Sequence, residues 1–519
     1  MSDQSAIEPT SRRGLPSTLR LLRDRTQEGI EGAARRLRGS PTARLGARDQ
    51  RRLTAEIDAC LSPELGDVVT RVHAAEVADL YRSLDRVGRA RFFAVLAEHY
   101  HIQRTAVEDA AAHYEAAAHD PEDDAAVLSA ESRLRSALVP GWERLFRLFI
   151  GTEGGVKFTV DLRADLRSVI SAARRAAARP GAPGKAAAGA AAPPDDAEAE
   201  ATAAVGLARL IRLDADLREV LDQAFDVGLL ELRRITWDSP AAFLEKLIAY
   251  EAVHEITSWA DLKHRLRPDR RCFAYVHPAM PDEPLIFVEV ALVDELATSI
   301  HPLLDQSAPV ADTAAASWAI FYSISTCQDG LAGVRLGDFL IKRVVNELQR
   351  DLPSLKNFST LSPIPGLRAW LERRLDEAGD ELVAGLSDAA RTQLVQLAGP
   401  HSDAPVDGLR HLLSTTDWLD DRARLAAAEP ALTQLAARYL VTERRDGRAS
   451  DRVANFHLSN GARVERIDFG ANVSPVGVRE SLGLMVNYRY ELDKIESNHL
   501  DYVVREKIPA SSAVNRQAS

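Results

Sequence analysis

Residues 322–366 constrain the fold more than any other part of this chain. They contain a strand-like apolar segment, a glycine-spaced loop that opens an amphipathic helix, and a second strand that ends at a Pro-rich turn. Glycines at 330, 333 and 337 allow backbone N–H groups to face outward, and the helix N-terminus adds partial positive charge. The pattern predicts a phosphate-bearing ligand beside a sheet, with the polar side chains of residues 359–362 nearby.

The length and composition of the chain indicate a soluble globular protein with more than one domain. Its 519 residues are too many for one ordinary core, and its hydrophobic content of 46% and charged content of 27% are typical of soluble domains. The net charge of −11 argues against nucleic acid as the main partner, because duplex binding needs a basic face. Cys60, Cys272 and Cys327 lie far apart without metal-ligand spacing, which predicts a reducing, cytoplasmic location.

Three segments are predicted to lie outside the folded domains. Residues 1–52 contain twelve Arg and six acidic residues, which predicts a basic flexible tail, since a transit peptide would be poor in acids. An insert at about 176–204 is almost entirely Ala, Pro, Gly and acids, and it is expected to be disordered because it has little bulky apolar surface. Residues 509–519 are predicted to form a second tail. No apolar run reaches the roughly 18 residues of a membrane span.

The N-terminal half, residues 53–232, is predicted to be an all-helical bundle. Apolar residues recur there at spacings of three to five, as expected for helices with one buried face. The Ser-Pro-Glu sequence at 62–64 predicts a helix start, with Val69 and Val72 on the apolar face of that helix. Residues 142–149 carry a further apolar stripe that contains one Trp and two Phe.

The C-terminal half, residues 233–508, is predicted to mix helices and strands. Apolar residues of an amphipathic helix over 340–350 are expected to pack on a sheet, and residues 366–443 are expected to form a helical insertion. Predicted strands span 272–275, 285–292, 318–325, 454–458, 464–468 and 484–490. The predicted fold class is therefore α+β, with a helical bundle followed by a larger mixed domain.

Several motifs in matching order give the chain a resemblance to the malonyl-CoA decarboxylase family. In the helical half they are RLRSALVP at 133–140 and GGVKFTVDLRADL at 154–166. In the mixed half they are the strand–loop–helix block itself, HPAMPDEPL at 277–285, LSPIPG at 361–366, NFHLSNGA at 455–462 and GLMVNYRY at 483–490. The resemblance covers roughly residues 75–508 and omits the insert and the first 52 residues.

This resemblance implies a fold, an activity and partners. The family has an N-terminal helical domain used in assembly, which implies a homodimer or homotetramer through that domain. The catalytic domain that follows has the GNAT-type acyl-CoA fold. The implied activity converts malonyl-CoA to acetyl-CoA and carbon dioxide without a metal or an organic cofactor. Malonyl-CoA is the implied partner, with no nucleic acid and no membrane span.

The resemblance also implies the positions of the site residues. The catalytic serine of the SPIPG motif corresponds to Ser362, and the catalytic histidine of the NFH motif corresponds to His457; both are also expected to bind substrate. The acyl-CoA loop corresponds to Ala332, Gly333, Val334, Arg335, Leu336, Gly337 and Asp338. The common GNAT loop pattern is Arg/Gln-x-x-Gly-x-Gly/Ala, whereas this chain has Ala first and Arg in place of the middle Gly. That departure weakens a role for loop side chains but leaves one for backbone amides.

The proposed chemistry accounts for these residue types. Loss of the carboxylate leaves two electrons on the α-carbon, and the thioester carbonyl accepts them as an enolate, so the substrate is its own electron sink. Hydrogen-bond donors aimed at the enolate oxygen stabilise it, and Ser362 is the expected donor. His457 is the expected general acid that protonates the α-carbon, because the ordinary pKa of histidine suits that role.

Other interpretations of the same residues remain open. Without the resemblance, Ser362 before proline is a turn residue, and His457 is a structural histidine. An N-acyltransferase of the same fold would move the acyl group to an amine, and a non-catalytic acyl-CoA sensor would keep the loop and lose the acid. Tyr488 and Tyr490 are explained equally well by an acyl pocket and by strand packing.

Overall fold

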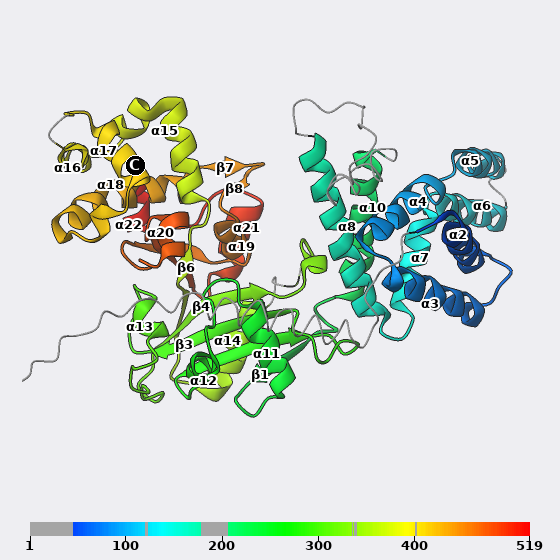
Figure 1. Cartoon of the computed structure of the whole chain (residues 1–519), viewed down its shortest axis with the longest axis horizontal. Helices are drawn as coiled ribbons and strands as arrows, with labels where there is room; N and C mark the ends of the chain where they lie inside the picture. The colour runs from blue at the N-terminus through cyan, green and yellow to red at the C-terminus, as the bar shows by residue number, and fades with distance from the viewer. Residues whose placement is uncertain (1–44, 120–122, 178–205, 335, 337–339, 400–401) are drawn as a thin grey trace, which may run out of the picture. The chain divides into compact units, whose positions relative to one another are not determined.

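The structure, a computed structural model, forms two compact units (Figure 1). The helical unit contains residues up to Ala224 together with Asp329–Gly333, and the mixed unit contains Phe225–Gln328 and Val334–Ser519. The structure describes residues 45–119, 123–177, 206–334, 336, 340–399 and 402–519. Within those ranges no helix has the length and apolar character needed to cross a membrane.

The helical unit confirms the predicted bundle. Its helices are α2 (Ala47–Leu61), α3 (Asp67–Ser83), α4 (Arg86–His99), α5 (Arg104–Ala118), α6 (Asp124–Ala137), α7 (Gly141–Ile150), α8 (Gly155–Ala177) and α10 (Leu207–Ala224). The predicted stripe on α7 is buried: Trp142, Leu145, Phe146 and Phe149 all face the core. Residues 178–205, which include most of the predicted disordered insert, lie outside the described residues.

Two local predictions in the helical half were wrong. Helix α3 begins at Asp67 and not at Ser62, because the Ser62 N–H bonds to the Ala59 carbonyl and closes α2 instead. Val69 and Val72 are 43% and 58% exposed, so the start of α3 does not bury its valines. The predicted tail over residues 1–52 lies mostly outside the described part of the chain, but its last residues form the first turn and a half of α2.

The mixed unit is built on an eight-stranded sheet. Its strands are β1 (Glu231–Ile235), β2 (Arg270–Val276), β3 (Ile286–Val293), β4 (Trp318–Thr326), β5 (Asn357–Thr360), β6 (Ser362–Pro363), β9 (Arg463–Asp468) and β10 (Met485–Tyr490). The order is β1-β2-β3-β4-β5-β10-β6, and β9 also pairs with β10. Only the β4–β5 pair is parallel among these strands, and the helix α14 (Leu340–Asp351) connects it. The observed order confirms the predicted helical domain followed by a mixed α/β domain.

Helices cover the sheet on both sides. On one face, α11 (Ala241–Tyr250) and α12 (Trp259–Arg265) pack on β1, β2 and β3 through an apolar cluster that includes Leu244, Leu262 and Phe287. The short α13 (His301–Leu304) joins a second cluster on the same face with Ile320 and Met485. The predicted apolar side of α14 is confirmed, since the buried residues of that helix are Leu340, Ile341, Val344, Val345 and Leu348.

The helical insertion predicted at 366–443 is confirmed, and a C-terminal helix packs beside it. The insertion contains α15 (Leu367–Ala384), α16 (Asp388–Ala398), α17 (Pro405–Ser414) and α18 (Arg422–Val441). Residues 509–519 were predicted to be a tail, but Ser512–Ala518 form α22 against α18 and β9. Ser511 caps this helix locally, because its side chain accepts the Val514 N–H. The Ser511 N–H also donates to the carbonyl of Val464, which attaches the segment to β9.

The remaining elements carry and support the site. They are β7 (Arg444–Arg445), β8 (Arg448–Ala449), α19 (Arg452–Ser459), α20 (Pro475–Ser481) and α21 (Ile495–Val503), with 3-10 turns at Asp329–Leu331 and Asp417–Leu419. Strands β4 and β5 pair through residues 318–321 and 357–360, and β5 pairs with β10 on its other side. Strand β6, which follows, pairs with β10 but not with β4. The sheet is therefore open beside β4 where the chain reaches Ser362.

Candidate active site

Ser362 lies beside β10, where β6 continues the register of β5 and β4 has stopped pairing. Its strand β6 is two residues long and pairs with β10, so that Ser362 is opposite Val486. Phe358 of β5 is opposite Tyr490, which is also on β10. Because strand residues alternate between faces, Thr360 and Ser362 lie on the face that carries Tyr488 and Tyr490. Ser362 is buried, with 6% of its surface exposed.

His457 reaches the same face from the helix α19. Residues 454–458 were predicted to form a strand, and that prediction was wrong: Asp451 caps a helix by accepting the Val453 and Ala454 N–H groups. The second oxygen of the Asp451 carboxylate accepts the Gly366 N–H at 3.3 Å. One buried carboxylate thus joins the end of the LSPIPG motif to the start of the helix that carries His457.

A series of hydrogen bonds connects the two predicted catalytic residues. The Ser362 hydroxyl donates to Thr360 Oγ1 at 2.9 Å, and Ser362 Oγ lies 3.3 Å from His457 Nε2. Since the serine has one proton and gives it to Thr360, Nε2 is the donor to Ser362 and Nδ1 is an acceptor. The Tyr490 hydroxyl, 2.8 Å away, donates to that Nδ1. The direction is therefore from Tyr490 through His457 and Ser362 to Thr360.

Aromatic rings hold the imidazole in place. The Tyr488 ring stacks on His457 with 4.6 Å between centroids and 26° between planes, and Tyr490 meets it edge-on at 6.1 Å. Tyr488 also donates its backbone N–H to Thr360 Oγ1 at 3.2 Å. Both tyrosines are therefore site residues as well as core residues. Arg489 belongs to the other face, where it reaches Asn357 and Glu465.

Burial sets the protonation states of this group. Desolvation lowers the pKa of His457 from 6.5 to about 3, so the imidazole is neutral at neutral pH. Desolvation also raises the pKa of Tyr490 well above its ordinary value, so its hydroxyl remains a donor. The ordinary pKa of histidine, on which the predicted role of His457 as general acid was based, therefore does not apply to the buried side chain. In the absence of substrate, the His457 imidazole and the Tyr490 hydroxyl are therefore both neutral.

The buried histidines predict how stability depends on pH. Desolvation lowers the pKa of His254 to about 3 as well, so both groups are neutral in the folded chain and take up a proton on unfolding below pH 6.5. The contribution of the two neutral histidines to the free energy of unfolding is complete above pH 6.5. It is lost as the pH falls toward 3, at about 1.4 kcal/mol per pH unit for each histidine. Between pH 7 and pH 5, the urea midpoint should therefore fall less steeply with decreasing pH in His457→Asn and in His254→Gln than in the wild type.

Exposed His113 gives the control for that measurement. His113→Asn should leave the slope of urea midpoint against pH at the wild-type value, because folding does not bury this side chain. Wild-type slopes in the His457→Asn and His254→Gln variants would contradict the assignment of two neutral buried histidines.

The predicted acyl-CoA loop is divided between the two units. Ala332 and Gly333 belong to the helical unit, whereas Val334 and Leu336 belong to the mixed unit. Arg335, Gly337 and Asp338 lie outside the described residues.

Gly330 has a packing role that sequence reasoning missed. A Cβ there would lie 1.8 Å from the Val160 carbonyl oxygen, so the residue is glycine because the chain passes against the backbone of α8. Gly333 has a φ of +81°, which favours glycine for conformational reasons. Arg343, in the helix α14 that follows the loop, donates to the Leu230 carbonyl at 3.0 Å and lies over the Tyr275 ring.

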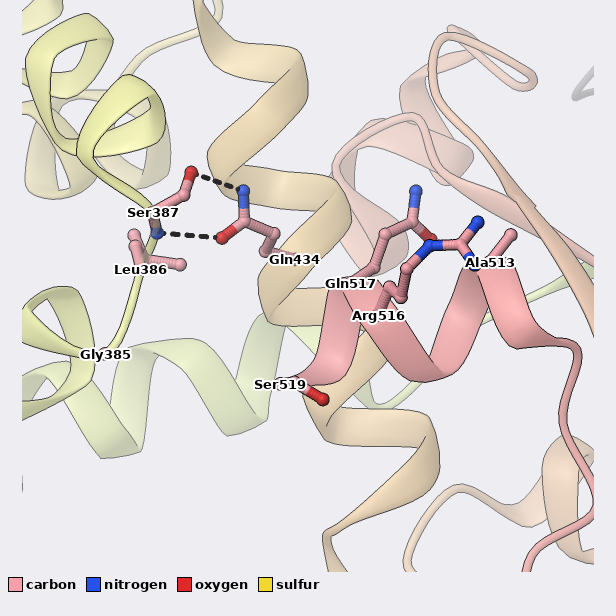
Figure 2. Close-up of a pocket in the computed structure, with 8 residues that line it drawn as sticks. All are labelled: Gly385, Leu386, Ser387, Gln434, Ala513, Arg516, Gln517 and Ser519. Atoms are coloured by element: carbon pink, nitrogen blue, oxygen red, sulfur yellow. Dashed lines mark hydrogen bonds between the residues drawn. The ribbon is translucent and has the colours of Figure 1, made fainter.

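Sequence reasoning placed Thr360 among the polar side chains of residues 359–362 near the ligand but gave it no role, and it missed Asp451. Neither residue type is distinctive in sequence, and only strand alternation over 358–362 gave a signal that Thr360 would share a face with Ser362. Among the described residues, no three His, Cys, Asp or Glu side chains are grouped so as to hold a metal ion. A pocket elsewhere in the mixed unit is lined by residues of α18 and α22 and by Ser387, which bonds Gln434; it contains neither Ser362 nor His457 (Figure 2).

Comparison with known proteins supplies independent findings. Residues 100–225 match the family model described as the malonyl-CoA decarboxylase N-terminal domain, and residues 228–519 match the model of its C-terminal domain. A protein of Anser anser anser named malonyl-CoA decarboxylase, mitochondrial, is 36% identical over 446 residues, which cover 85% of this chain and 82% of that protein. The Rattus norvegicus protein of the same name is 35% identical over 445 residues, or 85% and 84%.

Solved structures give the same result for the fold. The crystal structure of malonyl-CoA decarboxylase from Rhodopseudomonas palustris matches with a TM-score of 0.73 and 36% identity, covering 90% of this chain and 99% of that one. The corresponding structure from Agrobacterium vitis matches with a TM-score of 0.73 and 35% identity, covering 90% and 100%.

Proposed function

The chain belongs to the malonyl-CoA decarboxylase family, and we propose that Ser362 and His457 carry out its reaction. The reaction is the decarboxylation of malonyl-CoA to acetyl-CoA and carbon dioxide, and the enzyme is a carboxy-lyase. One observation carries the assignment of residues: Ser362 and His457, 95 residues apart, meet at 3.3 Å in a buried group.

The neutral donors of the site suit the charge that develops in this reaction. As the bond to the carboxylate breaks, its electron pair moves to the α-carbon and is delocalised onto the thioester oxygen. In the free chain the Ser362 hydroxyl donates to Thr360 and the His457 Nε2–H donates to Ser362. We assign both donors to the acyl oxygen or the carboxylate once substrate binds and replaces these partners. Donors of this kind typically contribute a few kcal/mol. Because the thioester accepts the electrons, the proposal needs no metal and no organic cofactor.

His457 is assigned as the general acid, with its proton acquired when substrate binds. The malonyl carboxylate is an anion, and an anion beside a buried imidazole favours the charged form and raises its pKa. After carbon dioxide leaves, the proton moves from His457 to the α-carbon and gives acetyl-CoA, so each turnover consumes one proton. The Tyr490 hydroxyl bonded to Nδ1 acts as a positioning group.

We assign the thioester arm of malonyl-CoA to the opening where β4 and β5 stop pairing. The parallel strands β4 and β5 stop pairing after Phe321 and Thr360, two residues before Ser362. An extended thioester arm with amide groups suits such an opening, because unpaired strand backbone offers donors and acceptors. We assign the loop of Ala332 to Asp338 to the CoA pyrophosphate.

We propose that the chain forms a homo-oligomer and that it is located in the cytoplasm. Val68 and Val72 on α3 are 78% and 58% exposed, which supports assembly into a homodimer or homotetramer through the helical unit. Light scattering on the purified chain tests this, and a monomer mass would contradict it. The three cysteines are buried free thiols, which supports the cytoplasm as the compartment.

The function is tested by product release without an acceptor. Purified protein supplied with malonyl-CoA and no amine should release carbon dioxide and acetyl-CoA in equal amounts. Absence of release would contradict the decarboxylase assignment. Consumption of malonyl-CoA only when an amine is added would instead support an N-acyltransferase of the same fold.

A further inference from the structure

We propose that Arg163, in the helical unit, is a positioning residue for coenzyme A, because it holds the start of the acyl-CoA loop through the carbonyl groups of Gly330 and Ala332. The proposal rests on the role in CoA binding proposed above for the loop. It gives the helical unit a part in substrate affinity in addition to a part in assembly.

The Arg163 side chain is buried, and its hydrogen bonds go to the loop and to Asp214. Its side chain is 1% exposed, and its Nη1 donates to the Gly330 carbonyl at 2.7 Å and to the Ala332 carbonyl at 2.8 Å. Its Nε donates to Asp214 Oδ1 at 2.9 Å. The Asp214 carboxylate, on α10, thus restricts the orientation of the guanidinium. Hydrogen bonds from a charged donor are shorter and stronger than neutral ones, which suits a fixed backbone conformation.

The packing of this segment adds to the effect of Arg163. Gly330 passes so close to α8 that a Cβ would lie 1.8 Å from the Val160 carbonyl oxygen, and Leu331 is 1% exposed. Residues Asp329–Gly333 form part of the helical unit, whereas Gln328 and Val334 belong to the mixed unit. These five residues therefore pack as part of the helical unit, through hydrogen bonds to their carbonyl groups and the close backbone contact at Gly330.

Holding the carbonyl groups determines where the N–H groups point. In a trans peptide the C=O of one residue and the N–H of the next point in opposite directions. With the Ala332 carbonyl directed at Arg163, the Gly333 N–H is directed away from it, and that N–H donates to no other described residue. Outward N–H groups in a fixed glycine turn are the donors that bind phosphate oxygens. Arg163 thus fixes the first donor of the proposed phosphate loop.

The test is CoA binding by full-length variants, measured by isothermal titration calorimetry. Arg163→Met keeps the apolar stem and removes the donors, and it should raise the Kd for CoA about tenfold, because the loop must then be ordered on binding. With malonyl-CoA the KM should rise by a similar factor while kcat changes less than about threefold. Arg174→Met, an exposed arginine on the same helix, is the matched control and should keep the wild-type Kd.

A wild-type Kd for CoA in folded Arg163→Met would overturn the proposal, and so would a loss confined to kcat. If Arg163→Met does not fold, as judged by circular dichroism, Arg163→Lys decides the question. Lysine keeps the charge but lacks the fork that reaches two carbonyls and Asp214, so a rise of about threefold in Kd is expected, and an unchanged Kd overturns the idea. A wild type that binds CoA without releasing carbon dioxide contradicts only the proposed function.

Discussion

Replacement of His457 by asparagine is expected to lower kcat for malonyl-CoA decarboxylation by about 10³-fold. The reason is that the variant has no group that takes up a proton beside the substrate anion, and a positioned general acid typically contributes 10²–10⁴-fold. The Kd for CoA should stay close to the wild-type value, since the nucleotide contacts are assigned to the separate loop. Steady-state release of carbon dioxide and calorimetric CoA binding measure the two quantities.

Proton uptake gives a second measurement on the same variant. In wild type, binding of a non-reacting malonyl-CoA analogue should take up close to one proton per site, seen as a dependence of the binding heat on the buffer. His457→Asn should lose that uptake, whereas exposed His113→Asn should retain it. Unchanged turnover in His457→Asn would show that another group protonates the α-carbon.

Replacement of Ser362 by alanine should give a smaller loss, of about 10- to 100-fold in kcat. Removal of one donor to a developing oxyanion typically costs 10²–10³-fold, and the Nε2–H of His457 remains to bear part of the charge. The Thr360 hydroxyl keeps a partner in the Tyr488 N–H, so the local structure should survive. Initial rates of acetyl-CoA formation measure the effect.

The double variant separates catalytic from merely structural roles. If Ser362 and His457 act as one unit, combining Ser362→Ala with His457→Asn should lower kcat little further than His457→Asn alone. If the fold-losses in kcat of the two single variants instead multiply in the double variant, the two residues act independently. The hydrogen bond between them would then not contribute to catalysis. Tyr490→Phe removes only the donor to His457 Nδ1, and it should lower kcat less than Ser362→Ala or His457→Asn does.

The local elements were predictable because their signals are local. The strands β2, β3, β4, β9 and β10 and the buried side of α14 follow from apolar runs and from periodicity, which depend only on neighbouring residues. The strand predicted at 454–458 failed for a related reason. Five residues around His457 carry too short a pattern to separate helix from strand, and the cap formed by Asp451 decided for the helix.

The sequence by itself determined the fold class, the motifs and the two residues assigned to the reaction. Only the tertiary structure decided that Ser362 and His457 touch, that Tyr490 supplies the second bond to the imidazole, and that His457 is neutral. It also decided that Arg163, 169 residues before Ala332 in the chain, holds the loop. The physical reason is common to all of these: desolvation, register between strands and the partner of a buried charge depend on residues far apart in the chain, which local periodicity does not encode.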